Sequence, residues 1–262
     1  MDETMDQRIC FISGGGLTVR YFLLYPETRR FFGRYLKEGN ICKDDPADPS
    51  QMHVISVSPE YMEDNRWLVD EKELSLPFLE FQALMLKTGN ELLLHDRALF
   101  HGAALLWKDR AWIFTAPSGT GKTTQLKHWQ KILQQEVTII NGDKPLLECR
   151  CGGDIWVHSS PWRGKERYGK PGVNGKLGGI ILLRQGKENK IRRIDPKDAV
   201  LPLFTEFVSF PEDTRQLECQ AQILDQILDA VPVWELVNKG NPASARLTIG
   251  IIGRYLEESE ND

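Results

Sequence analysis

The chain has 262 residues, of which 41% are apolar and 27% charged, which suits one large globular domain or a small domain joined to a larger one. Its formal net charge is -4 and its lysines and arginines form only short clusters, so nothing electrostatic favours a nucleic-acid or anionic-membrane partner. No run approaches the ~20 apolar residues of a membrane-spanning helix. We therefore expect neither nucleic-acid nor membrane binding.

Two features predict the cellular compartment. Residues 1–8 are polar and acidic, without the apolar segment of a signal peptide. The five cysteines are odd in number and spread out, and the closest pair has a C-x-C spacing that suits neither a zinc knuckle nor a redox motif. We expect reduced thiols in a cytoplasmic protein. The cysteines are Cys10, Cys42, Cys149, Cys151 and Cys219.

Residues 1–94 predict a small α+β lobe. Short β-rich segments cover 9–12, 19–24 and 53–57, and a turn-rich loop covers 43–50.

From Leu76 onward, apolar residues recur at helical spacing, although Gly89 is unfavourable inside a helix. We expect this helix to serve packing rather than a site.

Residues 95–256 predict a second, larger domain that begins with a hairpin. Two apolar runs, 103–107 and 111–115, are separated by a charged turn, and the second run leads directly into a glycine-bearing loop. A helix is predicted over 122–133. The apolar segment 137–140 is typical of a strand buried in an α/β sheet.

The C-terminal part predicts a further hairpin and three helices. The hairpin joins 178–183 to 190–194, and Asp195-Pro196 and Asn241-Pro242 each begin a helix with an N-cap residue followed by proline. A strand is predicted over 232–237, and residues 257–262 are predicted to be a disordered tail.

The remaining predicted helix, over 214–230, lies between these two in the sequence. It is amphipathic, and we expect its apolar face to belong to the core. That face carries Leu217, Ala221, Leu224 and Leu228.

The segment from Ala116 to Thr124 has the pattern of a phosphate-binding loop between a strand and a helix. Its glycines let backbone N–H groups turn toward a polyphosphate, Lys122 can reach the β and γ oxygens, and Thr123 can ligate magnesium. The strict pattern has glycine where Ala116 stands. The alternative is a glycine-rich turn that only caps the helix. The residues expected to bind ATP are Ser118, Gly119, Thr120, Gly121, Lys122, Thr123 and Thr124.

An acidic element follows at the end of the next predicted strand, in Asn141-Gly142-Asp143. A carboxylate at a strand end beside a phosphate-binding loop commonly holds the metal ion or its waters. Asp143 is therefore the candidate second metal-site residue beside Thr123. The alternative is an ordinary Asn-Gly-Asp turn.

These residues resemble the catalytic domain of HPr kinase/phosphorylase, which shares its nucleotide-binding core with ATP-dependent phosphoenolpyruvate carboxykinase. The resemblance covers roughly residues 95–255 and rests on the order of His101-Gly102, the hairpin, the loop 118–123 and a strand that leads to Asp143. It implies an α/β fold with a phosphoenolpyruvate carboxykinase-like P-loop core, a mixed sheet with helices, preceded by the small β-containing lobe. It also implies that Lys122, Thr123 and Asp143 bind phosphate and metal.

The family's paired acidic residues become Gly142-Asp143 here, so the aspartate that polarises the acceptor serine is missing. His101, whose counterpart lies in the family's active site, or Asp143 in a double role could supply the base. The alternative for His101 is a core histidine at the start of a strand.

Residues 159–167 form a loop with three cations in five positions, suited to a transferring phosphoryl group or an acidic acceptor. Arg163 is the first candidate and Lys165 the second, and an ordinary solvated basic loop is the alternative. Arg184, at a strand end, could also reach the nucleotide, although such arginines usually face water.

The sequence thus predicts an ATP- and magnesium-dependent serine kinase that acts on a peptide or protein. The segment after residue 166 lacks the family's phosphorolysis signature, which favours kinase activity alone. Relatives of HPr kinase modify ribosomally made peptides such as lasso peptides, which suggests the precursor of such a peptide as acceptor. The alternatives are a small-molecule hydroxyl kinase, an inactive ATP-binding sensor and, least favoured, a carboxykinase. A homo-oligomer is possible because the family's full-length members are hexamers.

Overall fold

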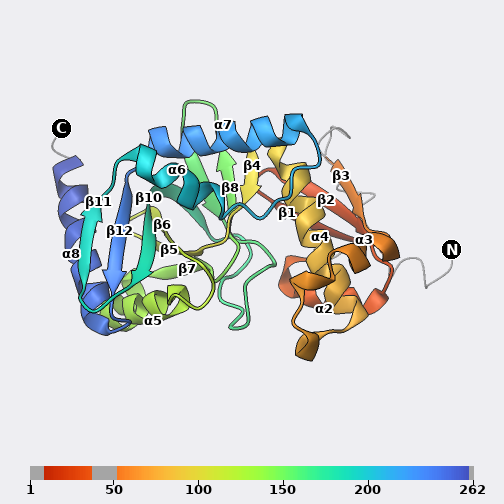
Figure 1. Ribbon diagram of the computed structural model, residues 1–262, viewed down its shortest axis with the longest axis horizontal. Helices are drawn as coiled ribbons and strands as arrows, with labels where there is room; N and C mark the ends of the chain where they lie inside the picture. Colours follow the sequence, from red (N-terminus) through yellow and green to blue (C-terminus); the bar gives the residue numbers. More distant parts are fainter. Residues whose placement is uncertain (1–8, 37–51, 260–262) are drawn as a thin grey trace.

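The computed structural model describes residues 9–36 and 52–259 of the chain. A small lobe with a three-stranded sheet lies beside a larger part built around a nine-stranded sheet (Figure 1). The predicted loop 43–50 and residues 260–262 of the predicted tail lie outside the described residues.

The N-terminal lobe contains the three predicted β segments. The central strand β2 pairs with β1 in antiparallel and with β3 in parallel orientation. The strands are β1 (Ile9–Gly14), β2 (Leu17–Phe22) and β3 (Met52–Ser56), and the α-helices are α2 (Arg29–Phe32), α3 (Pro59–Asp64) and α4 (Leu76–Leu93). Short 3₁₀ helices cover Pro26–Thr28, Gly33–Tyr35, Arg66–Leu68 and Glu71–Glu73.

Helix α4 runs unbroken through Gly89, although glycine is unfavourable inside a helix. A Cβ atom at this position would lie 1.8 Å from the carbonyl oxygen of Val208. The glycine therefore permits a close approach of two backbones. Most of the side chains of α4 are buried, as expected for a packing helix.

The core of this lobe continues into the larger part. Trp162 stacks on Phe81 at 5.6 Å between ring centroids and donates from its indole nitrogen to the Phe81 carbonyl oxygen over 3.2 Å. Leu99, Leu146 and Val208 belong to the same buried cluster. The predicted division at residue 94 falls in the connection between α4 and β4, but apolar packing crosses it.

The larger part is a mixed sheet with helices on both faces, so the predicted α/β class behind a small β-containing lobe is confirmed. Its long strand β10 pairs in parallel with β6 and β12 and in antiparallel with β9. The strands are β4 (Arg97–Leu99), β5 (Ala103–Trp107), β6 (Arg110–Thr115), β7 (Thr138–Asn141), β8 (Leu146–Cys149), β9 (Ile155–His158), β10 (Asn174–Gln185), β11 (Lys190–Arg193) and β12 (Val233–Asn238).

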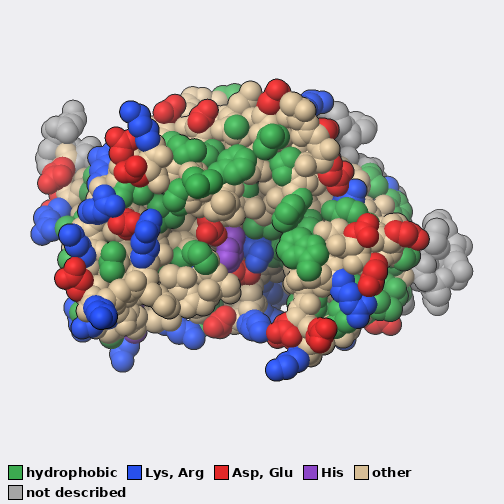
Figure 2. Space-filling view, in the orientation of Figure 1, with side chains coloured by type: hydrophobic (Ala, Val, Ile, Leu, Met, Phe, Trp, Pro, Cys, Tyr) green, Lys and Arg blue, Asp and Glu red, His purple; other side chains and the backbone are tan. Residues whose placement is uncertain are grey.

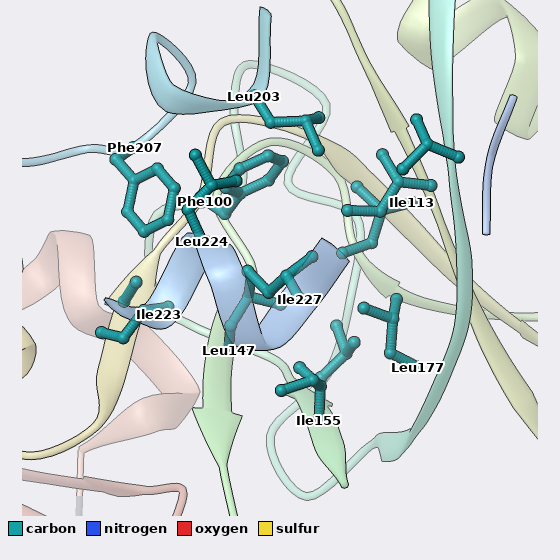
Figure 3. Close-up of a cluster of buried hydrophobic side chains, with 14 of the residues drawn as sticks. Phe100, Ile113, Leu147, Ile155, Leu177, Leu203, Phe207, Ile223, Leu224 and Ile227 are labelled. Carbon is teal, nitrogen blue, oxygen red and sulfur yellow. The ribbon is translucent and has the colours of Figure 1, made fainter. Parts of the chain in front are cut away.

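Alternate residues of each central strand enter separate cores. In β6, Ile113 joins a cluster under α6 and α7, whereas Trp112 and Phe114 join a cluster under α5 and α8. Figure 3 shows the first cluster, where side chains of α7 meet those of the sheet. Successive side chains of a strand point to opposite faces of the sheet, so a sheet covered by helices on both sides buries both sets. The helices are α5 (Lys122–Leu133), α6 (Pro196–Phe204), α7 (Thr214–Ala230) and α8 (Pro242–Ser259), with a 3₁₀ helix at Gln134–Glu136.

One interpretation of the C-terminal part is wrong and a second holds only in part. The predicted hairpin of 178–183 with 190–194 does not form, because β12 pairs with both β10 and β11 and lies between them. Of the predicted core face of α7, Leu224 is buried and Leu228 packs against the core, whereas Leu217 is exposed. Ala221 is exposed as well. The other buried residues of this helix are Gln220, Ile223 and Ile227.

The end of the chain is more ordered than the sequence suggested. Helix α8 continues through Glu257 and Glu258, where we expected a disordered tail to begin. Within residues 9–36 and 52–259, no helix combines the length and the apolar character needed to cross a membrane.

Candidate active site

The predicted phosphate-binding loop joins the end of β6 to the start of α5. Gly119 and Gly121 have φ angles of 80° and 112°, a region that glycine enters without strain. Ala116 is buried and keeps a negative φ, so alanine fits where the strict motif has glycine. The loop lies at the N-terminus of a 12-residue helix, where backbone N–H groups can bind an anion.

Lys122 is buried at the centre of this loop. Among the described residues its ammonium group has one hydrogen-bond partner, the Ala116 carbonyl oxygen at 2.7 Å, which leaves two donors for a ligand. Burial lowers the pKa of Lys122, and the charges of Asp143 and Glu206 oppose that shift. An anionic ligand at the loop would compensate for the buried charge.

Backbone hydrogen bonds bring His101 and Asp143 to the phosphate-binding loop. The His101 N–H donates to the Glu206 carbonyl oxygen over 2.7 Å, and the Gly102 N–H donates to the Asp143 carbonyl oxygen over 2.8 Å. The Thr115 hydroxyl at the end of β6 donates to the His101 carbonyl oxygen over 2.7 Å. Four separate segments are thus fixed around one point.

The side chains at this point form a chain of ionisable groups. His101 Nδ1 lies 2.8 Å from Glu206 Oε2, and His101 Nε2 lies 3.6 Å from Asp143 Oδ1. Lys144 Nζ lies 2.6 Å from Asp143 Oδ2. Sequence reasoning missed Glu206 and Lys144. The sequence offered only weak indications of these two residues. Lys144 is adjacent to Asp143, and Glu206 is a single carboxylate just after α6.

The turn that carries Asp143 is held by Asn141, whose side-chain oxygen accepts from the backbone N–H groups of Asp143 and Lys144, each at 2.9 Å. A Cβ atom at Gly142 would lie 2.9 Å from the Arg163 carbonyl oxygen and 3.0 Å from Tyr168 Cβ. The turn therefore leaves no room for a second carboxylate at position 142.

The basic loop places its two candidate cations differently. Arg163 donates to the carbonyl oxygens of Arg167 and Gly169, each over 3.2 Å. It does not line the cavity at Lys122, but it lines the neighbouring cavity between the two lobes. Lys165 does line that cavity, and its exposed ammonium pairs with Glu73 of the N-terminal lobe at 2.8 Å. Arg163 thus holds the loop in this structure. Arg184 is exposed and pairs with Glu235 at 2.6 Å.

Three cavities meet at the site. One of about 400 Å³ is lined by most of the loop together with His101, Asp143 and Lys165. A second of about 450 Å³ lies between the lobes and shares Asp143 and Lys165 with the first. A third of about 610 Å³ lies between the loop and the end of β10, with Glu206 in its wall. Figure 2 shows a hollow near the middle of this face, with a histidine and charged side chains inside it.

The donor set fits a magnesium nucleotide. Thr123 and Asp143 line the same cavity as Lys122, and hydroxyl and carboxylate oxygens are the ligands that magnesium prefers. Of the predicted nucleotide-binding residues, Ser118, Gly119, Gly121, Lys122, Thr123 and Thr124 border this cavity. Thr120 borders the third cavity.

Fold and site together define an α/β protein with a glycine-bearing loop, predicted to bind phosphate, between a strand and the start of a helix. No protein-family model matches the chain. No curated protein matches it either. Among solved structures, the chain is similar to the Hpr(Ser) kinase/phosphatase from Coxiella burnetii, with 9% identity over 63% of this chain and 99% of that chain and a TM-score of 0.33. A likeness this remote carries no argument about function, so the function is inferred from the residues of this chain.

Proposed function

We propose that the protein is an ATP- and magnesium-dependent kinase that transfers the γ-phosphate to a serine hydroxyl of a peptide or protein. One observation supports this most: Lys122, Thr123, Asp143 and His101 line a single cavity at the N-terminus of α5. Phosphoryl transfer depends mainly on positioning and on charge stabilisation, and this cavity contains the groups for both.

The nucleotide has room on both sides of the loop. The polyphosphate would lie against the backbone N–H groups of residues 118–123 and the Lys122 ammonium. The third cavity continues from the loop toward Leu182 and Pro202 and offers apolar and polar walls to the base and ribose. A magnesium ion bound with the nucleotide neutralises charge on the phosphate oxygens, and Thr123 and Asp143 are the residues that would hold it.

His101 is the best-placed base. Glu206 accepts the hydrogen of Nδ1, which leaves the lone pair of a neutral ring on Nε2, the nitrogen that faces Asp143. As the serine oxygen bonds to the γ-phosphorus, the bond to the bridging oxygen breaks and ADP leaves. The hydroxyl proton passes to His101 Nε2. Asp143 is less available, because Lys144 already binds its carboxylate.

The acceptor enters through the cavity between the lobes. This cavity shares Asp143 with the nucleotide cavity and combines the apolar side chains of Phe78, Phe81 and Trp162 with Lys165. An extended site of mixed character suits a peptide with an apolar side chain near its serine better than it suits a small polar molecule. Together with the resemblance to kinases that modify ribosomally made peptides, this supports the precursor of a modified peptide as acceptor. A small-molecule acceptor is the alternative.

One observation favours a second candidate, an ATP-binding sensor without transferase activity. The position where related kinases have a second aspartate is Gly142, and it is too closely packed for a side chain. If His101 does not act as base, the chain would bind ATP tightly and transfer nothing.

The test is incubation of the full chain with ATP, magnesium and a library of serine-containing peptides, followed by mass spectrometry for one added phosphate. Lys122→Ala is the negative control. Phosphate added by the wild type alone would support the kinase. Tight ATP binding with no transfer to peptides or to small hydroxyl compounds would favour the sensor instead.

A further inference from the structure

We propose that His53, Glu91 and His95 form a binding site for a divalent transition-metal ion such as Zn²⁺ in the N-terminal lobe. The three residues come from two elements. His53 lies in β3, Glu91 in the last turn of α4, and His95 just after that helix. This site is separate from the proposed nucleotide site, and its test does not depend on kinase activity.

The geometry brings one potential ligand atom of each residue together. Glu91 Oε1 lies 3.1 Å from His53 Nδ1 and 3.2 Å from His95 Nε2, and all three ligand atoms lie within 4.8 Å of one another. Donor atoms about 2.0–2.2 Å from one tetrahedral ion lie roughly 3.3–3.6 Å apart. Small side-chain adjustments would therefore place a single ion between them.

The chemistry of the donors is that of a zinc site. Two imidazole nitrogens and one carboxylate oxygen are a common set of three protein ligands, with the fourth position left to water. The spacing of Glu91 and His95 places both near one side of the end of α4, and the two histidine rings lie 4.0 Å apart between centroids. Magnesium prefers an all-oxygen set, so the two sites differ in the ion that they would select.

A second observation concerns the hydrogen bonding of His53. Its side chain is only 10% exposed, yet its Nε2 atom has no hydrogen-bond partner among the described residues. The ring is thus held through Nδ1 alone, on the side that faces Glu91. A bound ion would anchor this buried ring by a stronger contact than the hydrogen bond now present.

The nearest cation does not occupy the site. The Arg97 guanidinium donates to the carbonyl oxygens of Gly15 and His95, at 2.6 Å and 2.5 Å. It also pairs with Glu148 at 3.1 Å. These three partners hold the guanidinium in place, and its contact with the His95 backbone helps to hold that residue in place.

A metal ion here would join β3 to the end of α4. Helix α4 leads through β4 directly to His101, so the ion would stabilise the lobe that borders the proposed acceptor cavity. A structural ion of this kind contributes its binding free energy to folding.

The test is titration of the metal-free full chain with Co²⁺, followed by absorbance, and with Zn²⁺, followed by calorimetry. We expect the wild type to bind one equivalent of either metal ion. His95→Ala and Glu91→Gln, which change partly exposed residues, should lose that equivalent or bind at least about tenfold more weakly, since even outer-shell changes cost about 10- to 100-fold. Zn²⁺ should raise the melting temperature of the wild type and not of these variants.

Two control variants test whether the bound metal ion lies at this site and not elsewhere. His128→Ala changes a histidine on α5, and Asp143→Asn changes the carboxylate of the nucleotide site. Both should retain the bound ion. The proposal is overturned if the wild type binds no equivalent, if His95→Ala and Glu91→Gln bind it as tightly as the wild type, or if Asp143→Asn abolishes it.

Discussion

His101 and Glu206 are joined twice, once through their side chains at 2.8 Å and once through their backbones at 2.7 Å. The double contact fixes the imidazole so that Nε2 faces Asp143 in the cavity at Lys122. A histidine held in one tautomer by a buried carboxylate is suited to accept a proton.

Replacing His101 by alanine is expected to lower kcat for peptide phosphorylation by about 10²–10⁴-fold, the usual contribution of a general base. The affinity for ATP should stay near that of the wild type, because Lys122 and the loop backbone remain. Steady-state kinetics and nucleotide binding check both quantities, with His128→Ala as the matched control. An unchanged kcat would exclude His101 as the base.

Glu206 acts through His101, so Glu206→Gln should lower kcat without changing KM for the peptide. A purely structural role would instead lower the melting temperature and weaken ATP and peptide binding together with kcat. The measurements are steady-state kinetics and thermal unfolding of both proteins.

Lys122→Met should separate activity from stability. Transfer is expected to fall by about 100- to 1000-fold or more, because a charged donor at the phosphate is lost. The free energy of unfolding should stay the same or rise, since burial lowers the pKa of Lys122 and the variant no longer buries an ammonium group. Urea unfolding measures this, with Lys131→Met on the same helix as control. A large loss of stability would show that Lys122 is structural.

Gly142→Ala should destabilise the protein by about 1–3 kcal/mol, as expected when an atom is forced into a packed site. Its Cβ atom would approach the Arg163 carbonyl oxygen and Tyr168. Gly250→Ala in α8 is the control, because a Cβ there meets nothing within 4 Å and alanine favours helix. Equal unfolding free energies for the two variants would contradict the packing described for the Asp143 turn.

Stability should fall in mild acid because of His158. Burial lowers its pKa, although the hydrogen bond to Glu148 opposes this. Below about pH 6.5 the unfolded chain therefore binds more protons than the folded one, and the unfolding free energy decreases until the pH passes the folded pKa. The measurement is the free energy of unfolding, determined with urea at a series of pH values. Its slope against pH in mild acid should be smaller in His158→Gln and unchanged in the control His128→Gln. An unchanged slope in His158→Gln would show that His158 does not cause the loss of stability.

Glu148 adds a second acid-sensitive contribution. Burial would raise its pKa, but hydrogen bonds from Arg150 and His158 and their charges outweigh that effect and lower it. The stability that this provides is present above the ordinary glutamate pKa near ~4.3 and is lost as the pH falls through the folded value. It extends the loss of stability to lower pH than His158 alone.

The local elements of the site could be predicted from sequence because short-range chemistry specifies them. The apolar run before Ala116, the glycines of the loop and the helix from Lys122 are contiguous, and all three occur as expected. The close association of His101 with Glu206 could not be predicted, because 105 positions separate them.

The errors have a common physical cause in long-range pairing. Segments 178–183 and 190–194 have the pattern of a hairpin, but β12 pairs with both of them. Apolar periodicity does not reveal a strand inserted from 40 or more positions away. Similarly, the apolar character of Leu217 predicts burial, yet α7 is rotated so that Gln220 faces the core instead.

The most direct measurement uses ATP whose γ-phosphate carries heavy oxygen isotopes, incubated with magnesium, the full chain and an acceptor peptide. We expect mass spectrometry to find the heavy phosphate on a serine with the wild type and not with Lys122→Met. If the heavy phosphate appears only as inorganic phosphate, or reaches the peptide equally well with Lys122→Met, this loop does not carry out the transfer and the proposed function is wrong.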